Sequence, residues 1–505
     1  MMNSSAQIPK RIRINSSFLR LGLVQAFTAL GIWAVASGGE IFRAFALGSI
    51  TLSMLTALVV SFEAGLTAMI LFEPFRGVLR RVQYLIVPYS SSEPIHLITP
   101  IVAFFAFAFL LSRHKLDIFR HTPLAAATSI LAAICFLQIF NPLQGSLSVG
   151  LVGALYYLVP MTWFYFGQAA KPDFVPRMLR FIVVLAIFTS LYGVYQLGFG
   201  YPFFEQVWLE NTDKYSSISV YKIQRALATF SNSEEWGRYI QIGCLIAAGL
   251  GLTRSEGKKR VVWFGAAAAL IALLALTGQR TSIFGLMLGL AILFLTGARD
   301  FRGAAARAML MLVPFVLMFA LVNPLTDDDG LNSDDKFGAM LTHTSKGVVD
   351  PASEGSLSVR LETWTEIVTE TLPSNPIGTG LGMTTLAATR ADANDESAID
   401  NHFLSLALSA GIPAALLLFW ILLRALVFCF RGWRDSEYGS EQADLWRIMM
   451  ALTATLILNN FFGTSFTIYS VAPIGWLIVG WISKAYAEMQ NAPSETENYE
   501  EEWLD

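Results

Sequence analysis

The sequence contains few charged residues and few cysteines. Only 14% of its 505 residues are Asp, Glu, Lys or Arg, and 54% are hydrophobic, whereas soluble domains carry about a quarter charged residues. This composition excludes an ordinary soluble protein, and nothing in it implies a nucleic-acid partner. The three cysteines, Cys135, Cys244 and Cys429, lie in or beside apolar runs. Their spacing fits neither a disulfide framework nor a metal site, so we interpret them as packing residues.

Most of the chain consists of apolar runs that approach the length of a membrane span. A transmembrane helix needs about 20 predominantly apolar residues. Such runs occur at 19–38, 44–72, 97–112, 122–140, 150–167, 177–197, 237–253, 260–277, 281–297, 306–322, 402–428, 446–464 and 468–487. We therefore predict an all-α, polytopic transmembrane bundle of about 12–14 spans with a large, partly helical loop.

Lysine and arginine in short loops predict the orientation, because they favour the cytoplasmic side. Three basic turns fall on one side: Lys258–Arg260, Arg299–Arg307 and Arg431–Arg434. Single crossings throughout would place the basic N-terminus on the opposite side. We therefore expect the 44–72 run, which contains Glu63, to form two short segments; one tilted span is the alternative.

This orientation divides the chain into tails, membrane helices and two long non-cytoplasmic loops. The predicted segments are an N-terminal tail (1–18), N-terminal spans (19–197), a first loop (198–236), central spans (237–322), a large loop (323–401), C-terminal spans (402–487) and an acidic tail (488–505). Five apolar residues of the large loop recur at helical spacing and predict an amphipathic helix: Val359, Trp364, Ile367, Val368 and Leu372. The glycines that follow would let the backbone approach a ligand closely.

Three arginines fall on the non-cytoplasmic side, namely Arg225, Arg280 and Arg360. An arginine at membrane depth is costly and usually faces a cavity or the bundle interior. Three guanidinium groups on one face can hold a pyrophosphate through charge-assisted hydrogen bonds. The alternatives are an interfacial Arg280 that reaches lipid phosphate and solvated loop charges for Arg225 and Arg360.

A polar cluster, Asp400, Asn401 and His402, directly precedes a late span. A carboxylate or an imidazole can act as a general base that takes a proton from an attacking hydroxyl group. The alternative is a helix N-terminus, where Asp400 or Asn401 caps free backbone NH groups. The sequence contains no Gly-rich phosphate loop, metal-ligand cluster or nucleophilic serine motif.

Four stretches in a fixed order resemble the O-antigen ligase and Wzy-type polymerase superfamily of bacterial cell-surface polysaccharide assembly. They read RALATFSNSEEWG, LTGQRTSIFGL, SVRLETWTEIVTETLPSNPIGTGLG and DNHFLSLALSAGIPA. In ligases the closing motif begins His-Asn, whereas Asp400 and Asn401 occupy those positions here. This departure favours a polymerase.

The resemblance implies a metal-independent glycosyl transfer without a cofactor, at the periplasmic face of the bacterial inner membrane. The donor would be a glycan on undecaprenyl pyrophosphate, and the acceptor a second lipid-linked repeat unit. Arg225, Arg280 and Arg360 would bind the pyrophosphate, and Asp400 or His402 would activate the acceptor. Membrane lipids, a chain-length regulator and export machinery are the other expected partners. The alternatives are a ligase with another acceptor and, from a different class, a flippase for lipid-linked oligosaccharides.

Overall fold

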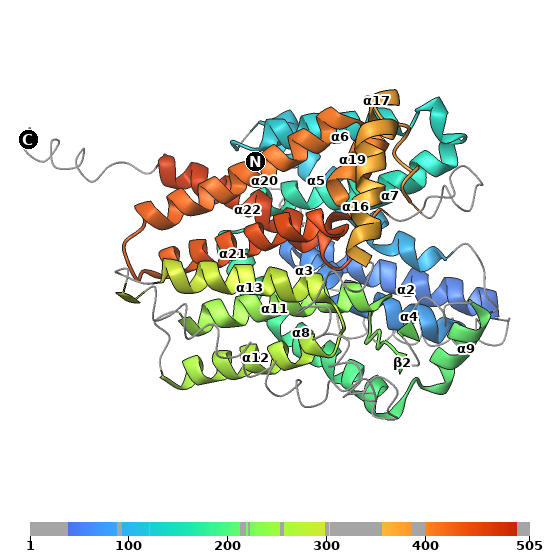
Figure 1. The fold of residues 1–505 in the computed structure, drawn as a ribbon, viewed down its shortest axis with the longest axis horizontal. Helices are drawn as coiled ribbons and strands as arrows, with labels where there is room; N and C mark the ends of the chain where they lie inside the picture. The colour runs from blue at the N-terminus through green and yellow to red at the C-terminus, as the bar shows by residue number, and fades with distance from the viewer. Residues whose placement is uncertain are drawn as a thin grey trace, which may run out of the picture.

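The computed structural model describes residues 39–87, 93–120, 122–212, 219–220, 223–252, 257–297, 302–303, 356–385 and 399–491. In these ranges the regular elements are helices, apart from one antiparallel pair of two-residue strands, β1 (Ser219–Val220) and β2 (Ile223–Gln224). The predicted spans at 19–38 and 306–322, both tails and most of the large loop lie outside the described residues. Figure 1 shows the long helices packed side by side in one bundle.

The N-terminal half contributes the helices up to residue 211. They are α2 (Gly39–Val60), α3 (Phe62–Phe72), η1 (Glu73–Phe75), α4 (Arg76–Gln83), η2 (Pro94–Leu97), α5 (Ile98–His114), η3 (Lys115–Phe119), α6 (Ala125–Gln138), η4 (Pro142–Gln144), α7 (Leu147–Ala169), α8 (Phe174–Phe199) and α9 (Phe203–Asn211).

The C-terminal half contributes the helices from residue 233 onward. They are α11 (Ser233–Leu252), α12 (Gly257–Ala275), α13 (Arg280–Thr296), α16 (Ser356–Glu366), η7 (Ile367–Thr371), α17 (Leu372–Ser374), α19 (His402–Ala410), α20 (Ile412–Asp435), α21 (Glu441–Phe461), η8 (Ser465–Thr467) and α22 (Ala472–Gln490).

Membrane-spanning helices confirm the predicted fold class. Five described segments are long and apolar enough to cross a bilayer: Gly39–Val60, Pro94–Phe119, Leu147–Ala169, Phe174–Phe199 and Ile412–Asp435. Two shorter apolar helices, α6 and α13, accompany them. The chain is therefore an all-α, polytopic membrane protein.

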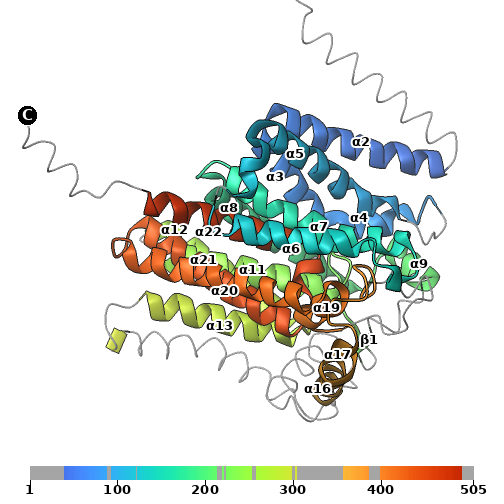
Figure 2. The same ribbon diagram turned by 90° about the horizontal axis from the view of Figure 1, so that it is seen from above.

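The apolar run 44–72 is divided into α2 and α3, as the two-segment interpretation predicts. The break falls at Ser61, whose hydroxyl accepts a hydrogen bond from the Ala64 NH (3.0 Å) and caps α3. Glu63 in the first turn of α3 forms an ion pair with Lys171 at 3.7 Å. The two helices lie side by side in Figure 2. Because α3 returns toward the start of α2, one predicted span becomes two antiparallel segments.

The predicted span 402–428 is also divided, at Gly411. This glycine has φ +93° and lies against Gly378, which has φ +98°. A Cβ on Gly378 would lie 2.7 Å from the Gly411 nitrogen, so only glycine lets the two backbones meet. Gly378 therefore makes its close approach to the α19–α20 junction, and the approach of the large-loop glycines to a ligand stays a prediction.

The amphipathic helix predicted in the large loop is confirmed as the continuous run α16, η7 and α17. Ile367 and Leu372 are buried in a small apolar cluster with Ile399 and Leu408, whereas Val359 is exposed. The apolar face thus packs against α19 and fixes the helix across the end of the bundle, where Figure 2 shows it. The three cysteines are buried and free, as the packing interpretation predicts.

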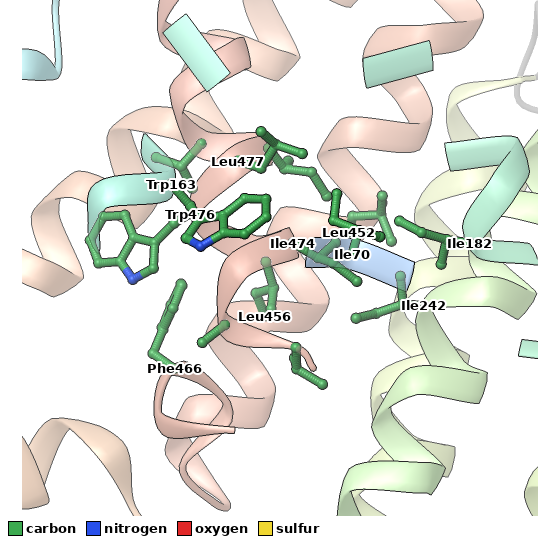
Figure 3. Close-up of a cluster of buried hydrophobic side chains, with 14 of the residues drawn as sticks. Ile70, Trp163, Ile182, Ile242, Leu452, Leu456, Phe466, Ile474, Trp476 and Leu477 are labelled. Atoms are coloured by element: carbon green, nitrogen blue, oxygen red, sulfur yellow. The ribbon is translucent and has the colours of Figure 1, made fainter. Parts of the chain in front are cut away.

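The core is centred on α7, α11, α21 and α22, and Figure 3 shows part of it. Trp476 of α22 lies 5.0 Å from Phe466, measured between ring centroids. Helices in a membrane associate through close packing at small residues, and α7 and α22 meet in this way. A Cβ on Gly480 would lie 1.9 Å from the carbonyl oxygen of Phe164.

We expect Gly480→Ala to lower the stability of the folded protein, because the added methyl group would force α7 and α22 apart. Overpacking of this kind costs about 1–3 kcal/mol. The measurement is the melting temperature of the detergent-solubilised protein. Gly265→Ala in α12 is the matched control, since open space surrounds that position, and it should melt like the wild type. Equal melting of Gly480→Ala and Gly265→Ala would contradict the prediction.

Candidate functional site

The candidate site lies where α11, α13 and α19 begin, and we call this part of the bundle the site end. The Gln279 side-chain amide, one residue before α13, donates to the Ser233 hydroxyl at the start of α11 (3.1 Å). The His402 NH at the start of α19 donates to the Gly463 carbonyl (2.9 Å). The first bond joins the N-termini of α11 and α13 to each other, and the second joins the start of α19 to the loop between α21 and α22.

The helix from the large loop brings Arg360 to Asp400. Their side chains form an ion pair at 2.7 Å, and both are partly exposed, at 35% and 46%. The Trp364 ring of the same helix packs near Phe462 of the α21–α22 loop, with 6.0 Å between centroids. Two of the predicted site residues therefore lie together, in a position that an incoming ligand can reach.

His402, the other candidate base, points into the protein. It is 1% exposed, and its ring lies 5.8 Å from both Tyr157 and Phe466. Its Nδ1 atom has no hydrogen-bond partner. Asn401 caps α19 by accepting a hydrogen bond from the Leu404 NH (3.0 Å). The predicted cap is thus Asn401, and Asp400 is left to pair with Arg360.

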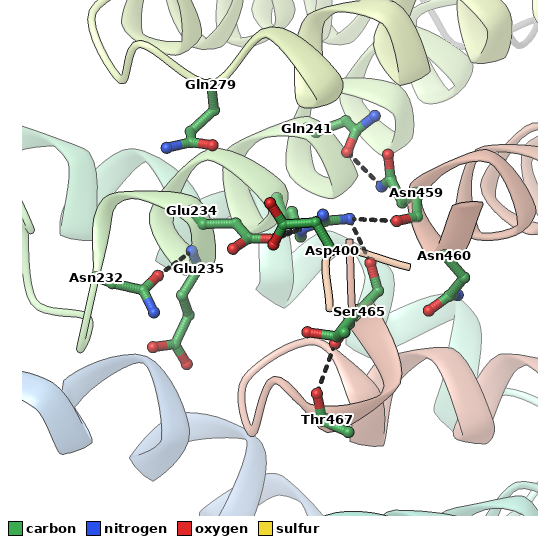
Figure 4. A network of polar contacts seen from close by, with 12 residues as sticks. Asn232, Glu234, Glu235, Gln241, Gln279, Asp400, Asn459, Asn460, Ser465 and Thr467 are labelled. Atoms are coloured by element: carbon green, nitrogen blue, oxygen red, sulfur yellow. Dashed lines mark hydrogen bonds and ion pairs between the residues drawn. The ribbon is translucent and has the colours of Figure 1, made fainter. Parts of the chain in front are cut away.

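Arg238 in the second turn of α11 organises the site end, although its importance was not predicted from the sequence. Its guanidinium donates to Glu234 (2.6 Å) and to the Asn459 carbonyl (3.1 Å), and it also binds the Ser465 hydroxyl. Figure 4 shows three of these partners, Glu234, Asn459 and Ser465, in one view with Asp400. Gly463 must lack a side chain because a Cβ there would lie 2.0 Å from Arg238. The sequence offered one signal that could have identified Arg238: it is an arginine within an apolar run, and burying an arginine is costly unless it is paired.

The remaining predicted arginines occupy different surroundings. Arg280 is half-buried in the first turn of α13, next to Gln279, and belongs to the site end. Arg225 follows β2, and its carbonyl accepts a hydrogen bond from the Tyr201 hydroxyl. Tyr201 belongs to an apolar cluster with Trp208 of α9. A shared pyrophosphate role for Arg225, Arg280 and Arg360 stays a prediction.

A second group of buried charges lies beside the start of α11. Arg76 of α4 stacks on Tyr469, with its Cζ 3.7 Å from the ring centroid, and its Nε lies 3.5 Å from the Glu73 carboxylate. Glu235 of α11 accepts hydrogen bonds from the backbone NH groups of Ser231 (3.0 Å) and Ser470 (3.3 Å). We call Glu73, Arg76, Tyr156, Tyr469 and Glu235 the Arg76 cluster.

Two further ion pairs hold the chain segments around the Arg76 cluster in place. Arg81 binds Glu205 at 2.7 Å and also donates to the carbonyls of Ala228 and Phe230, so every part of its guanidinium is engaged. Glu93 forms an ion pair with Arg80 and a contact with His96 at 3.1 Å. His96 lies in η2, and its ring stacks on Tyr469.

The surroundings of Glu93 lower its pKa to about 2. Burial acts in the opposite direction and raises the pKa, but hydrogen bonds from His96 and Tyr84 and the charge of Arg80 stabilise the carboxylate more strongly. An unfolded chain has a glutamate pKa of about 4.3. The stability that Glu93 contributes is therefore fully present above about pH 4.3 and is lost as the pH falls toward 2.

We expect Glu93→Gln to lower the melting temperature at pH 7, and we expect the difference from the wild type to shrink below about pH 4. The measurement is a series of thermal melts between pH 7 and pH 3. Glu40→Gln is the control, because the Glu40 side chain that pairs with Arg43 is 63% exposed, and ion pairs of solvent-exposed carboxylates contribute little. A difference that stays constant across this pH range would contradict the assignment.

Comparison with known proteins agrees with the resemblance seen in the sequence. A family model described as O-antigen ligase (Wzy_C) matches residues 264–419, which include most of α12, all of α13, α16 and α19, and the start of α20. A search of curated proteins finds no match. The resemblance to the O-antigen ligase and Wzy-type superfamily is confirmed, and the match supports a membrane glycosyltransferase of the ligase or polymerase type.

Proposed function

We propose that this chain, with its O-antigen ligase domain at residues 264–419, is a polysaccharide polymerase. It joins repeat units carried on undecaprenyl pyrophosphate, at the periplasmic face of the bacterial inner membrane. The growing glycan is the donor, and a hydroxyl on the terminal sugar of a second lipid-linked unit is the acceptor. The transfer needs no metal ion.

The observation that carries the proposal is the Arg360–Asp400 ion pair at the start of α19. It places a partly exposed cation and a partly exposed carboxylate together, beside the first turn of α11. Helix N-termini carry a partial positive charge and attract phosphate groups. Arg280, half-buried in the first turn of α13, adds a second cation to this end. These groups suit a lipid-linked pyrophosphate.

The chemistry assigned to the site is a single displacement. The acceptor hydroxyl oxygen forms a bond to the anomeric carbon of the donor, and the bond from that carbon to the pyrophosphate oxygen breaks. The lipid pyrophosphate leaves with the electron pair, so the anomeric configuration inverts. Guanidinium groups stabilise the charge that develops on the leaving group.

The ion pair supplies a way to couple donor binding to proton transfer. In the free protein Arg360 neutralises Asp400. A bound pyrophosphate competes for the Arg360 guanidinium, and Asp400 then becomes available to accept the proton of the attacking hydroxyl. Asp400 is therefore the favoured base. His402 is the less suitable candidate, because its ring is enclosed by Tyr157 and Phe466.

A ligase is the second candidate function, and the description of the matched family favours it. A ligase would use the same donor and pass the finished glycan to another acceptor. The aspartate at the position of the ligase histidine favours the polymerase.

We expect Arg360→Ala, Asp400→Ala and Arg280→Ala each to lower the rate of chain formation about 100-fold, the usual loss when one charge-stabilising group is removed. The measurement is glycan size in a host deleted for the gene and complemented with each variant at equal membrane levels. Arg434→Ala is the matched control, since this exposed arginine lies at the far end of α20. His402→Ala tests the other candidate base.

A double variant in which Arg360 and Asp400 exchange their charges distinguishes a catalytic role of the ion pair from a structural one. If the ion pair only holds α16 in place, Arg360→Asp/Asp400→Arg should restore long chains; we expect it to remain inactive. Single lipid-linked repeat units in the deletion host support the polymerase. Long chains that stay on the lipid indicate the ligase, and repeat units that remain on the cytoplasmic leaflet contradict both glycosyl-transfer functions and indicate the flippase.

A further inference from the structure

Two buried charged residues of the Arg76 cluster have polar atoms without hydrogen-bond partners. Glu73 and Arg76 are each 3% exposed. Neither carboxylate oxygen of Glu73 has a partner of ordinary geometry, and neither do Nε and Nη1 of Arg76. Their mutual contact of 3.5 Å is long for an ion pair. A buried ion pair whose polar atoms are not all hydrogen-bonded is costly, so within the described residues these atoms retain hydrogen-bonding capacity for a ligand.

Aromatic rings adjoin the same pair. The guanidinium of Arg76 lies on Tyr469, whose ring centroid is 5.1 Å from that of Tyr156. The ring of His96 stacks on Tyr469 at 5.8 Å. A sugar ring needs this combination of groups, because its hydroxyls donate to carboxylates and accept from guanidinium groups, while its C–H faces pack on aromatic rings.

The charge of the cluster distinguishes between ligands. Glu73 and Glu235 both act on Arg76, and Glu235 also acts on Glu73. Two carboxylates beside one guanidinium disfavour a bound anion such as a pyrophosphate or an acidic sugar. An uncharged sugar rich in hydroxyl groups meets no such repulsion.

The cluster also adjoins the candidate site. Glu234 and Glu235 are consecutive residues of α11, yet Figure 4 shows the Glu234 carboxylate pointing toward Asp400 and the Glu235 carboxylate pointing away. Glu234 binds Arg238, and Glu235 binds the backbone of Ser470, next to Tyr469. The first turn of α11 therefore separates the Arg360–Asp400 pair from the Arg76 cluster.

We propose that the Arg76 cluster is the binding site for the acceptor, and that it holds an uncharged, hydroxyl-rich sugar at the end of the lipid-linked repeat unit. Glu73 accepts hydrogen bonds from the sugar hydroxyls, Arg76 donates to their oxygens, and Tyr156 packs on the ring, while Tyr469 holds the Arg76 guanidinium in place. This inference rests on the proposed function, because it assigns the second substrate of the same transfer. The donor pyrophosphate stays on the Arg360 side.

The test is direct binding of an acceptor that cannot act as a donor. The probe is the repeat-unit oligosaccharide released by mild acid from the lipid-linked units of the deletion host, since it keeps its terminal hydroxyls and lacks the pyrophosphate. Binding to the full-length protein in nanodiscs is measured by titration calorimetry. Undecaprenyl pyrophosphate without sugar is the second probe.

We expect Glu73→Gln and Tyr156→Leu each to weaken oligosaccharide binding at least about tenfold, the loss expected for one hydrogen bond to a charged group. Both should bind undecaprenyl pyrophosphate within about twofold of the wild type. Glu63→Gln is the matched control, because Glu63 lies on α3, the helix directly before Glu73, and pairs with Lys171; it should bind both probes normally. If Glu73→Gln fails to fold, Tyr156→Leu decides the result.

Wild-type affinity of both variants for the oligosaccharide would overturn the proposal, and so would a wild-type protein that does not bind the oligosaccharide. In that event Glu73 and Arg76 are structural. Failure of the acceptor-site proposal is distinguishable from failure of the proposed function, because the first is measured by oligosaccharide binding and the second by glycan size in cells. Long chains made by the wild type, together with unchanged binding in the variants, would reject the acceptor site alone.

Discussion

The site end depends on one buried arginine. Arg238 ties the second turn of α11 to the loop between α21 and α22, through Glu234, the Asn459 carbonyl and Ser465. Burying a guanidinium is costly, and the cost is offset only because its donors are engaged in this way. The loop so fixed supplies the Gly463 carbonyl to α19, and it continues into Tyr469, on which Arg76 lies. Both groups of charges around the start of α11 therefore depend on the same anchor.

Helical geometry explains how one helix end serves two groups of charges. Adjacent residues of an α-helix point about 100° apart, so Glu234 and Glu235 project from α11 in different directions. One carboxylate holds Arg238 on the side of Asp400, and the other receives the backbone of Ser470 on the side of Arg76. Two substrates that must meet at one bond can thus be held on either side of a single rigid turn, which keeps the cations for the donor apart from the carboxylates of the Arg76 cluster.

Local patterns in the sequence predicted the helices, whereas contacts between residues far apart in the sequence determine the geometry of the candidate site. The amphipathic helix of the large loop and the cap at Asn401 follow from periodicity and capping chemistry within a few residues, and the division of the 44–72 run follows from the sidedness of the basic turns. The pairing of Arg360 with Asp400 joins residues from opposite ends of a long segment, and no local pattern fixes it. Arg238 and Arg76 were visible only as charges in or beside apolar runs, because their partners come from other helices. His96 illustrates the same limit, since its place on Tyr469 depends on the packing of η2 against the α21–α22 loop.

The hydrogen-bond partners of a buried charged residue help to distinguish a structural role from a role in ligand binding. Arg81 and Arg76 lie on the same short helix, and both are buried. Arg81 binds Glu205 and two backbone carbonyls, so its burial is explained by the fold itself. Arg76 has a long contact with Glu73 and stacks on Tyr469, and among the described residues its Nε and Nη1 have no hydrogen-bond partner. The two arginines share a helix, burial and charge, so the difference in their hydrogen bonds is what supports the proposal that Arg76 binds a group from outside the chain. Under the proposed function that group is the acceptor sugar, whose hydroxyls can bond to the Glu73–Arg76 pair.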